Sequence, residues 1–505
     1  MQLVAYGAQD VYLTGNPQIT FWKVTYRRYT NFSMESIEQT FNGQADFGRR
    51  VTCTISRNGD LAYRTYLQVT LPEIAQSTDC LHARWLDFPG HQLISQVELE
   101  IGGQRIDRQY GDWMHIWTQL TLSAEQARGY NKMIGHTTQL VYTTDPEFAA
   151  VDGPCGDASA PAQVCAPRNA LPETTLYVPL QFWFCRSPGL ALPLIALQYH
   201  EVKINLDLRP IDECLWAVKG LAETAGAQAT TAYSQSLVAA SLYVDYVFLD
   251  TDERRRMAQN PHEYLIEQLQ FTGDESVGSS SNKIKLNFNH PCKELVWVVQ
   301  PDANVDYCSS FKGGNPLYWT MGAQPFNYTD AVDALPNSIR AFSSDAGNGN
   351  VITASGLFAD GMVTDASATS GLTDSVSDAA SFVLAETALD MHCWGLNPVV
   401  VAKLQLNGQD RFSEREGTYF DQVQPFQAHT RAPDTGINVY SFALRPEEHQ
   451  PSGSCNFSRI DNATLQLVLS NATVSGQNTA KVRVYATNYN VLRVMSGMGG
   501  LAYSN

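Results

Sequence analysis

The sequence has none of the short motifs that mark the common classes of enzyme. It contains no Gly-x-Ser-x-Gly elbow, no His-Glu-x-x-His, no Walker loop and no Gly-x-Gly-x-x-Gly turn. The dipeptides at 200–201 and 262–263 are His-Glu, but both lack the second histidine that a zinc peptidase needs. The 10 histidines recur in no fixed spacing with carboxylates, so we interpret them as surface residues or satisfied core residues. We therefore predict no catalytic residue, no metal site and no cofactor.

Long apolar runs are also absent. No stretch approaches the roughly 18 consecutive apolar residues of a membrane-spanning helix, so no membrane span is expected. Residues 1–7 lack a basic region followed by a long apolar core, so we expect no secretory signal. The 10 cysteines contain no Cys-x-x-Cys pair and are expected to be reduced and mostly buried. Cys155 and Cys165 share one proline-rich loop in which a disulfide could form, but we favour free thiols.

Basic residues are scarce. Only 17% of residues are charged, and 51 acidic against 34 basic residues give a net charge of −17. A chain of this sign repels nucleic-acid phosphates, so we predict no direct nucleic-acid binding. The arginines at 254–256 are a single basic cluster, which we assign to an inter-domain or inter-subunit helix rather than to a phosphate site.

Strand patterns dominate what is present. Apolar residues from Leu61 to Leu71 recur at every second position, which is typical of a strand with one buried face. Short helices are predicted at 126–134, after a capping box at 123–126, and at 250–258, before Asn260-Pro261. Further strands are predicted at 93–101, 176–184, 201–208, 237–249, 265–271, 283–288, 294–299, 399–406, 437–444, 463–469 and 480–487.

The chain also repeats itself faintly. Gly103-Gln104 and Gly408-Gln409 each follow an alternating apolar run, and the similarity continues downstream. Downstream, the first copy has Arg105, Gly111, Trp113 and Met114 where the second has Arg411, Gly417, Tyr419 and Phe420. Upstream, residues 39–43 resemble 270–273, and the strand that ends at Pro72 resembles the strand that ends at Pro301. Two similar β-sandwiches in tandem indicate a structural building block. The alternative is a carbohydrate-binding or carbohydrate-active sandwich that uses clustered aromatic residues and paired carboxylates.

Two segments depart from the repeat. Residues 1–30 are polar and aromatic, and we expect an arm that either docks on another molecule or packs on the first domain. The segment from Pro301 to Gly408 is far longer than that from Pro72 to Gly103, so the second copy carries a large insertion, expected to face solvent. Asn-x-Ser/Thr sequons occur by chance in such chains, and among them Asn327 is our candidate glycan acceptor.

Several longer runs resemble one known family. They are 3–21, 26–32, 38–41, 101–104 and 110–113 in the first half, and 456–461, 485–493 and 495–505 in the second. These runs resemble the major capsid proteins of nucleocytoplasmic large DNA viruses from end to end, except in 302–398. The resemblance implies an all-β fold of two tandem eight-stranded jelly rolls with short helices and long loops. It also implies a structural protein of the virion shell, not an enzyme.

The resemblance carries further expectations about organisation and partners. The domains would be an arm at 1–30, a first jelly roll at 31–258, and a second at 259–505 with an inserted loop at about 302–398. Three chains would form a homotrimer, a pseudo-hexagonal capsomer that tiles an icosahedral capsid with neighbouring capsomers, minor capsid proteins and penton proteins. Assembly would occur in the host cytoplasm. The arm would lie on the inner face, where Trp22, Lys23, Arg27 and Arg28 would dock on minor proteins and, through them, on an internal viral membrane.

Overall fold

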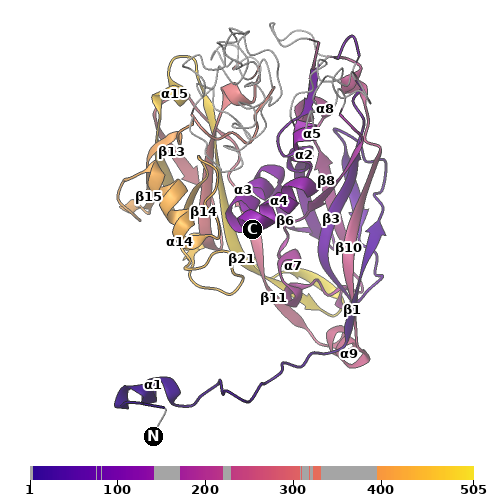
Figure 1. The fold of residues 1–505 in the computed structure, drawn as a ribbon, viewed down its shortest axis with the longest axis vertical. Helices are drawn as coiled ribbons and strands as arrows, with labels where there is room; N and C mark the ends of the chain where they lie inside the picture. Colours follow the sequence, from indigo (N-terminus) through magenta and orange to yellow (C-terminus); the bar gives the residue numbers. More distant parts are fainter. Residues whose placement is uncertain are drawn as a thin grey trace, which may run out of the picture.

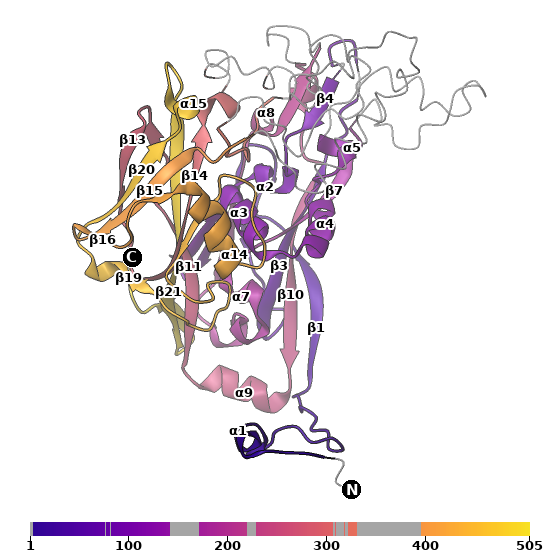
Figure 2. The ribbon, with the colours of Figure 1, turned by 60° about the vertical axis from the view of Figure 1, so that its left-hand side comes forward.

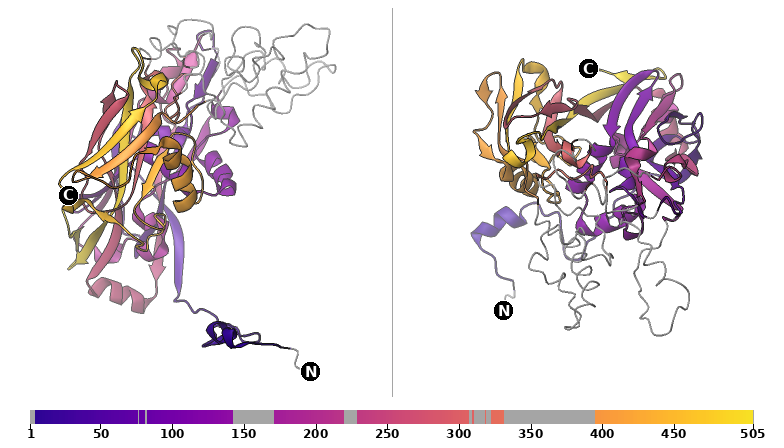
Figure 3. Two further views of the ribbon diagram at one scale, coloured as in Figure 1. Left: turned by 90° about the vertical axis from the view of Figure 1, so that its left-hand side faces the viewer. Right: turned by 90° about the horizontal axis from the view of Figure 1, so that it is seen from above.

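Two β-sandwiches stand side by side, and an extended N-terminal arm projects from one end of the molecule (Figures 1 and 3). In this computed structural model the short helices lie between strands and at the sandwich ends (Figure 1). The described residues are 4–75, 77–80, 82–141, 171–219, 229–306, 309, 318, 322–330 and 395–504.

The first sandwich consists of two four-stranded antiparallel sheets, with strand orders β1-β10-β3-β7 and β2-β8-β5-β6. A separate two-stranded sheet, β4-β9, lies at one end. The strands are β1 (Phe32–Gln39), β2 (Arg50–Thr54), β3 (Leu61–Leu71), β4 (His82–Trp85), β5 (Ile94–Ile101), β6 (Gln104–Tyr110), β7 (Thr174–Pro179), β8 (Val202–Leu208), β9 (Leu215–Val218) and β10 (Ala239–Leu249).

The second sandwich repeats this strand order. Its sheets run β11-β21-β14-β18 and β13-β20-β15-β16, and the short strands β12, β17, β19 and β22 pair at their margins. Each sandwich therefore has eight principal strands in the jelly-roll arrangement, which confirms the predicted fold class. The strands are β11 (His262–Phe271), β12 (Glu275–Val277), β13 (Ser281–Leu286), β14 (Pro291–Pro301), β15 (Val399–Leu406), β16 (Gln409–Asp410), β17 (Arg415–Glu416), β18 (Asn438–Ser441), β19 (Cys455–Asn456), β20 (Ala463–Leu469), β21 (Ala480–Met495) and β22 (Met498–Leu501).

The matched glycines occupy equivalent turns. Gly102 and Gly103 have φ values of 58° and 84° between β5 and β6, while Asn407 and Gly408 have 53° and 79° between β15 and β16. Two consecutive residues with positive φ form the tight hairpin turn that suits the twist of paired strands, and glycine adopts it without steric cost. The repeated Gly-Gln signal in the sequence is therefore a repeated hairpin.

Short helices connect the strands and cap the sandwiches. One of them, α9, links β10 of the first sandwich to β11 of the second (Figure 2). Ser123 caps α4, as the sequence predicts, and Asp250 caps α9. The helices are α1 (Val11–Thr14), α2 (Pro89–Leu93), α3 (Gly111–Thr121), α4 (Ala124–Met133), α5 (Thr138–Val141), α7 (Trp183–Arg186), α8 (Ile211–Cys214), α9 (Thr251–Gln259), α14 (Gln424–Ala428) and α15 (Asn471–Val474), and a π-helix, η7 (Tyr419–Val423), precedes α14.

The structure corrects two predictions: the extent of the strand at 176–184, and the interpretation that the arm packs on the first domain. The strand expected over 176–184 ends at Pro179, because Phe182, Trp183 and Phe184 are all buried around α7 and cannot alternate between two faces. Residues 4–30 do not pack on the first sandwich: all are exposed except Asp10, which is partly buried. Most of the insertion predicted at 302–398 lies outside the described residues, as do Cys155 and Cys165.

Candidate assembly surfaces

The first sandwich covers the outer face of one sheet of the second. Along β14, Leu295, Trp297 and Val299 point into the core of the second sandwich. Val296 and Val298 point the other way and join the apolar cluster of the first sandwich. Nearly every residue of β14 is therefore buried, as expected for a strand covered on both faces.

Aromatic residues form the centre of this interface. The ring centroids of Tyr110 and Phe271 are 5.0 Å apart, and those of Trp113 and Tyr485 are 5.4 Å apart. Tyr110 ends β6 and Trp113 lies on α3, whereas Phe271 and Tyr485 are register partners on β11 and β21. Aromatic pairs in these offset and tilted arrangements add about 0.5–1.5 kcal/mol beyond the area that they bury.

A buried ionic cluster lies beside the aromatic residues. One carboxylate oxygen of Glu267 accepts from Arg186 at 2.6 Å, and the other accepts from Lys293 at 2.6 Å and lies 3.3 Å from His449. Burial raises the pKa of Glu267, but the hydrogen bond from His449 and the charges of Arg186 and Lys293 outweigh it and bring this pKa to about 2. Because Arg186 belongs to the first sandwich, the ionised carboxylate ties the two sandwiches together.

A second group of polar contacts extends the interface. The Leu269 backbone N–H donates to Asp107 at 3.1 Å, and Arg431 donates to the backbone and side-chain oxygens of Gln119. Burial outweighs the hydrogen bonds to Asp107 and raises its pKa to about 7. Arg483 of β21 pairs with Asp112 at 3.4 Å. These contacts run from β6 and α3 of the first sandwich to the second.

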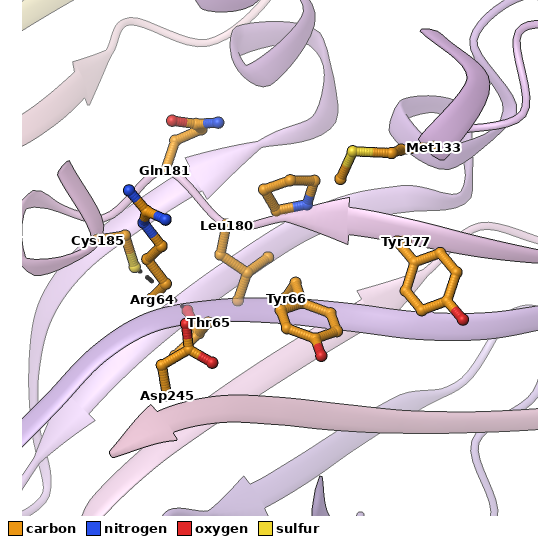
Figure 4. Close-up of a pocket in the computed structure, with 10 residues that line it drawn as sticks. Arg64, Thr65, Tyr66, Met133, Tyr177, Leu180, Gln181, Cys185 and Asp245 are labelled. Atoms are coloured by element: carbon orange, nitrogen blue, oxygen red, sulfur yellow. Dashed lines mark hydrogen bonds between the residues drawn. The ribbon is translucent and has the colours of Figure 1, made fainter. Parts of the chain in front are cut away.

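Among the described residues, none covers the outer face of the equivalent sheet of the first sandwich, β1-β10-β3-β7, in this way. A hollow of about 450 Å³ opens on its outer face, lined among others by Tyr66, Tyr177, Met133 and Asp245 (Figure 4). The aromatic lining would suit the alternative of a carbohydrate site. However, Asp245 is the one carboxylate that the described residues contribute to the lining of this hollow, whereas glycoside hydrolysis usually needs two.

A histidine cluster lies buried in the first sandwich. His91 and His115 are each 1% exposed, and the His115 ring lies 4.4 Å from both Phe88 and Phe326. Burial lowers the pKa of His91 to about 3 and that of His115 well below its usual value, so these rings are neutral. Neither ring nitrogen of His115 has a hydrogen-bond partner among the described residues, whereas Nε2 of His91 lies 2.7 Å from the Tyr130 hydroxyl.

The described part of the chain contains no cluster of histidine, cysteine, aspartate and glutamate side chains suited to a metal ion. Of the described cysteines, Cys53, Cys80, Cys214 and Cys292 are buried, Cys185 and Cys455 are partly buried, and all six are free thiols. Within the same residues, no helix has the length and apolar character needed to cross a membrane.

The arm residues selected from the sequence are fully accessible. Trp22 is 83% exposed, and Lys23, Arg27 and Arg28 are exposed on the same arm, which runs out from the sandwiches in Figure 1. Phe21 and Ile19 beside them are also exposed. Such a run of unburied apolar and basic side chains has no stabilising role in the isolated fold.

Asn327, the glycan candidate, is partly buried. Its side-chain N–H donates to Gln324 at 2.8 Å, and its side-chain oxygen accepts from the backbone and hydroxyl of Thr329. Glycosylation at this position would place a sugar on a side-chain nitrogen that is already partly buried and hydrogen-bonded to Gln324. Asn456 and Asn462 are exposed sequon positions.

The residues that hold the two sandwiches together are not among those predicted from the sequence. Glu267 lies in a predicted strand, and the sequence predicts no role for Arg186 or Lys293. The available signal was a charged residue at the centre of an apolar strand, since buried charges in strands are usually paired.

Comparison with known proteins gives one consistent result. The pattern of the family described as "Large eukaryotic DNA virus major capsid protein" matches residues 253–500, and that described as "Major capsid protein N-terminus" matches 20–250. The chain is 79% identical to the major capsid protein of Phaeocystis pouchetii virus and 70% identical to that of Chrysochromulina ericina virus, and each match covers 100% of this chain and 99% of the relative.

A solved structure agrees. A chain of the PBCV-1 virus capsid quasi-atomic model superposes with a TM-score of 0.64 at 36% identity, over 96% of this chain and 100% of that chain. The sequence matches extend over the whole chain, and this chain and the solved capsid protein share the double jelly-roll fold. The relatives are structural proteins rather than enzymes. The chain therefore belongs to the major capsid protein family of large eukaryotic DNA viruses and is a structural protein of the virion capsid.

Proposed function

We propose that three copies of this chain form a pseudo-hexagonal capsomer that tiles an icosahedral shell. The observation that carries the proposal is the repetition of one jelly-roll strand order in both halves of the chain. Three chains of two similar domains give six near-equivalent domains, which can occupy the corners of a hexagonal tile. The proposal includes the boundaries 1–30, 31–258 and 259–505, with neighbouring capsomers, minor capsid proteins and penton proteins as partners and assembly in the host cytoplasm.

Light scattering on the purified chain tests the trimer. We expect one species near three times 55.8 kDa that persists on dilution. A monomer at all concentrations would contradict the proposal, and binding to a glycan array would then favour the carbohydrate-binding alternative.

We further propose that the arm docks on minor capsid proteins, and through them on an internal membrane. The exposed side chains of Trp22, Lys23, Arg27 and Arg28 support this role, because burying a tryptophan and pairing nearby cations are typical of strong contacts. Asn327 remains a proposed glycan site, and peptide mass spectrometry of virions would detect a sugar there.

Deleting residues 1–26 should abolish closed particles without changing the capsomer. Because the described residues 4–26 are almost wholly exposed, the Tm and the number of chains per capsomer should stay at the wild-type values. Alanine at Trp22, Lys23, Arg27 and Arg28 together should reduce particle yield at least about tenfold. Electron microscopy of infected or reconstituted preparations measures this yield.

The matched control carries alanine at four other exposed arm positions: Gln18, Thr20, Thr25 and Thr30. It should assemble like the wild type. Normal particle yield after the deletion would show that the arm has no docking role.

A further inference from the structure

Two cysteines of the second sandwich lie opposite each other on neighbouring strands. The antiparallel register pairs Cys292 of β14 with Cys455 of β19. Side chains of directly opposite residues point to the same face of a sheet. Cys292 belongs to the apolar core of the second sandwich, and Cys455 packs against that core. The two thiols are therefore neighbours, although the residues are far apart in the sequence.

The backbone spacing at this position suits a disulfide. Opposite residues of an antiparallel pair have Cα atoms about 4.5–5.5 Å apart, and disulfides span Cα distances of about 4.4–6.8 Å. Strand β19 contains Cys455 and Asn456 alone, and β14 has an irregular register between Cys292 and Glu294. Because so short a strand shares few hydrogen bonds with its neighbour, the two sulfur atoms can approach each other without disrupting the sheet.

The two thiols differ in their access to solvent. Cys292 is 0% exposed, whereas Cys455 is partly exposed and follows the exposed residues Gly453 and Ser454. Burial raises the pKa of both thiols, but the positive charge of Arg411 opposes this effect at Cys455. An oxidant dissolved in water therefore reaches Cys455 first, and Cys292 is placed to react with it afterwards.

We propose that Cys455 and Cys292 form a reversible disulfide when the protein meets a small disulfide oxidant such as glutathione disulfide. The Cys455 thiolate attacks one sulfur of the oxidant, which forms a mixed disulfide and releases one glutathione thiolate. Cys292 then loses its proton and attacks the Cys455 sulfur, which forms the protein disulfide and releases the second glutathione thiolate. Two protein thiols are oxidised, one glutathione disulfide is reduced, and the two glutathione thiolates take up the two protons.

The bond would fasten a segment that completes the ionic cluster between the sandwiches. The chain between β18 and β19 carries Glu448, whose backbone oxygen accepts from Lys293 at 2.9 Å, and His449, which lies 3.3 Å from Glu267. A covalent link from β19 to β14 holds this segment against the strand that carries Lys293. Because the link also closes a long loop, it would stabilise the folded chain by restricting the unfolded one.

The state of this bond would follow the surroundings of the virion. Thiols stay reduced in the cytosol, whereas disulfides form and persist at virion surfaces and in other oxidising surroundings. The capsid protein would therefore gain the cross-link on leaving a reducing compartment and lose it on entering one again. The inference does not depend on the number of chains in the capsomer.

Peptide mass spectrometry tests the pairing directly. The purified chain is incubated with glutathione disulfide, its remaining thiols are alkylated, and it is digested without a reducing agent. We expect a linked pair of peptides that contain Cys292 and Cys455, and we expect this pair to be absent after incubation with reduced glutathione. A folded chain in which both thiols are alkylated, or in which Cys455 is linked to a different cysteine, would overturn the proposal.

Thermal unfolding measures what the bond does. The Tm of the oxidised wild type should exceed that of the reduced wild type by at least about 5 °C, and Cys455→Ser should remove this difference. Cys185→Ser is the matched control and should keep the difference, because Cys185 is also partly buried but lies 3.3 Å from the Thr65 hydroxyl on the first sandwich.

Two results would contradict the stabilising role. They are an undiminished rise in Tm on oxidation of Cys455→Ser, and a linked peptide pair in the wild type without any rise in Tm. If Cys455→Ser does not fold, the same comparison is made on the wild type before and after reduction of the isolated disulfide form. A Tm that stays unchanged on reduction would then count against the role.

Discussion

Replacing Glu267 with alanine is expected to lower the free energy of unfolding by about 3–5 kcal/mol, the cost of breaking a buried ion pair. Its carboxylate lies between Arg186 and Lys293, and the Lys293 side chain is 1% exposed. Removing the carboxylate leaves two cations in a buried interface without their counter-charge. Because Arg186 also stacks on Trp117 at 4.2 Å, its displacement would disturb α3 as well.

Chemical denaturation followed by tryptophan fluorescence measures this loss. The matched control is Glu263→Ala on the same strand, where Glu263 pairs with Arg493 and both side chains are more than half exposed. Exposed pairs contribute about 0–1 kcal/mol, so the control should unfold almost like the wild type. Equal losses in both variants would show that the buried cluster does not hold the sandwiches together.

Lowering the pH should remove the stabilisation that the ionised carboxylate of Glu267 provides. The pKa of Glu267 is about 2 in the folded chain against 4.5 ordinarily, so its stabilisation is complete above about pH 4.5 and is lost as the pH falls toward 2. At most about 3 kcal/mol follows from a shift of this size. In Glu267→Gln this part of the pH dependence should be absent, which unfolding curves at a series of pH values would show.

Replacing Gly417 with alanine is expected to cost about 3 kcal/mol or more, at the upper end for an overpacked site. A Cβ there would lie 1.8 Å from the carbonyl oxygen of Val399, which is far closer than atoms can approach. Gly111, its partner in the repeat, has the same constraint, because a Cβ would lie 2.2 Å from the carbonyl oxygen of His91. Both glycines let the chain following the hairpin pass close to a neighbouring backbone.

Thermal unfolding of Gly417→Ala and Gly111→Ala measures this effect, and both should lose soluble yield or Tm. Gly129→Ala is the matched control: Gly129 lies inside α4, and a Cβ there meets nothing within 4 Å. Alanine favours a helix interior over glycine by about 0.5–1 kcal/mol, so the control should be slightly more stable than the wild type. A stable Gly417→Ala chain would mean that the backbone contact can relax.

Local patterns in the sequence determined much of the architecture. The alternation over Leu61–Leu71 placed the buried face correctly, because a strand has a period of two whatever surrounds it. The cap at Ser123 and the repeated glycine turns also depend on local backbone geometry. These features were therefore predictable from neighbouring residues.

Only the tertiary structure decided which faces meet. Alternation shows that β3 and β14 each have an inner face, but not that the first sandwich covers the outer face of β14 and leaves Tyr66 on β3 open. The ionic partners of Glu267 come from three separate segments, and the sequence gives no distance between them. Residues distant in the chain meet only through the packing of whole sandwiches, which is why the strands were predictable and the surfaces that join them were not.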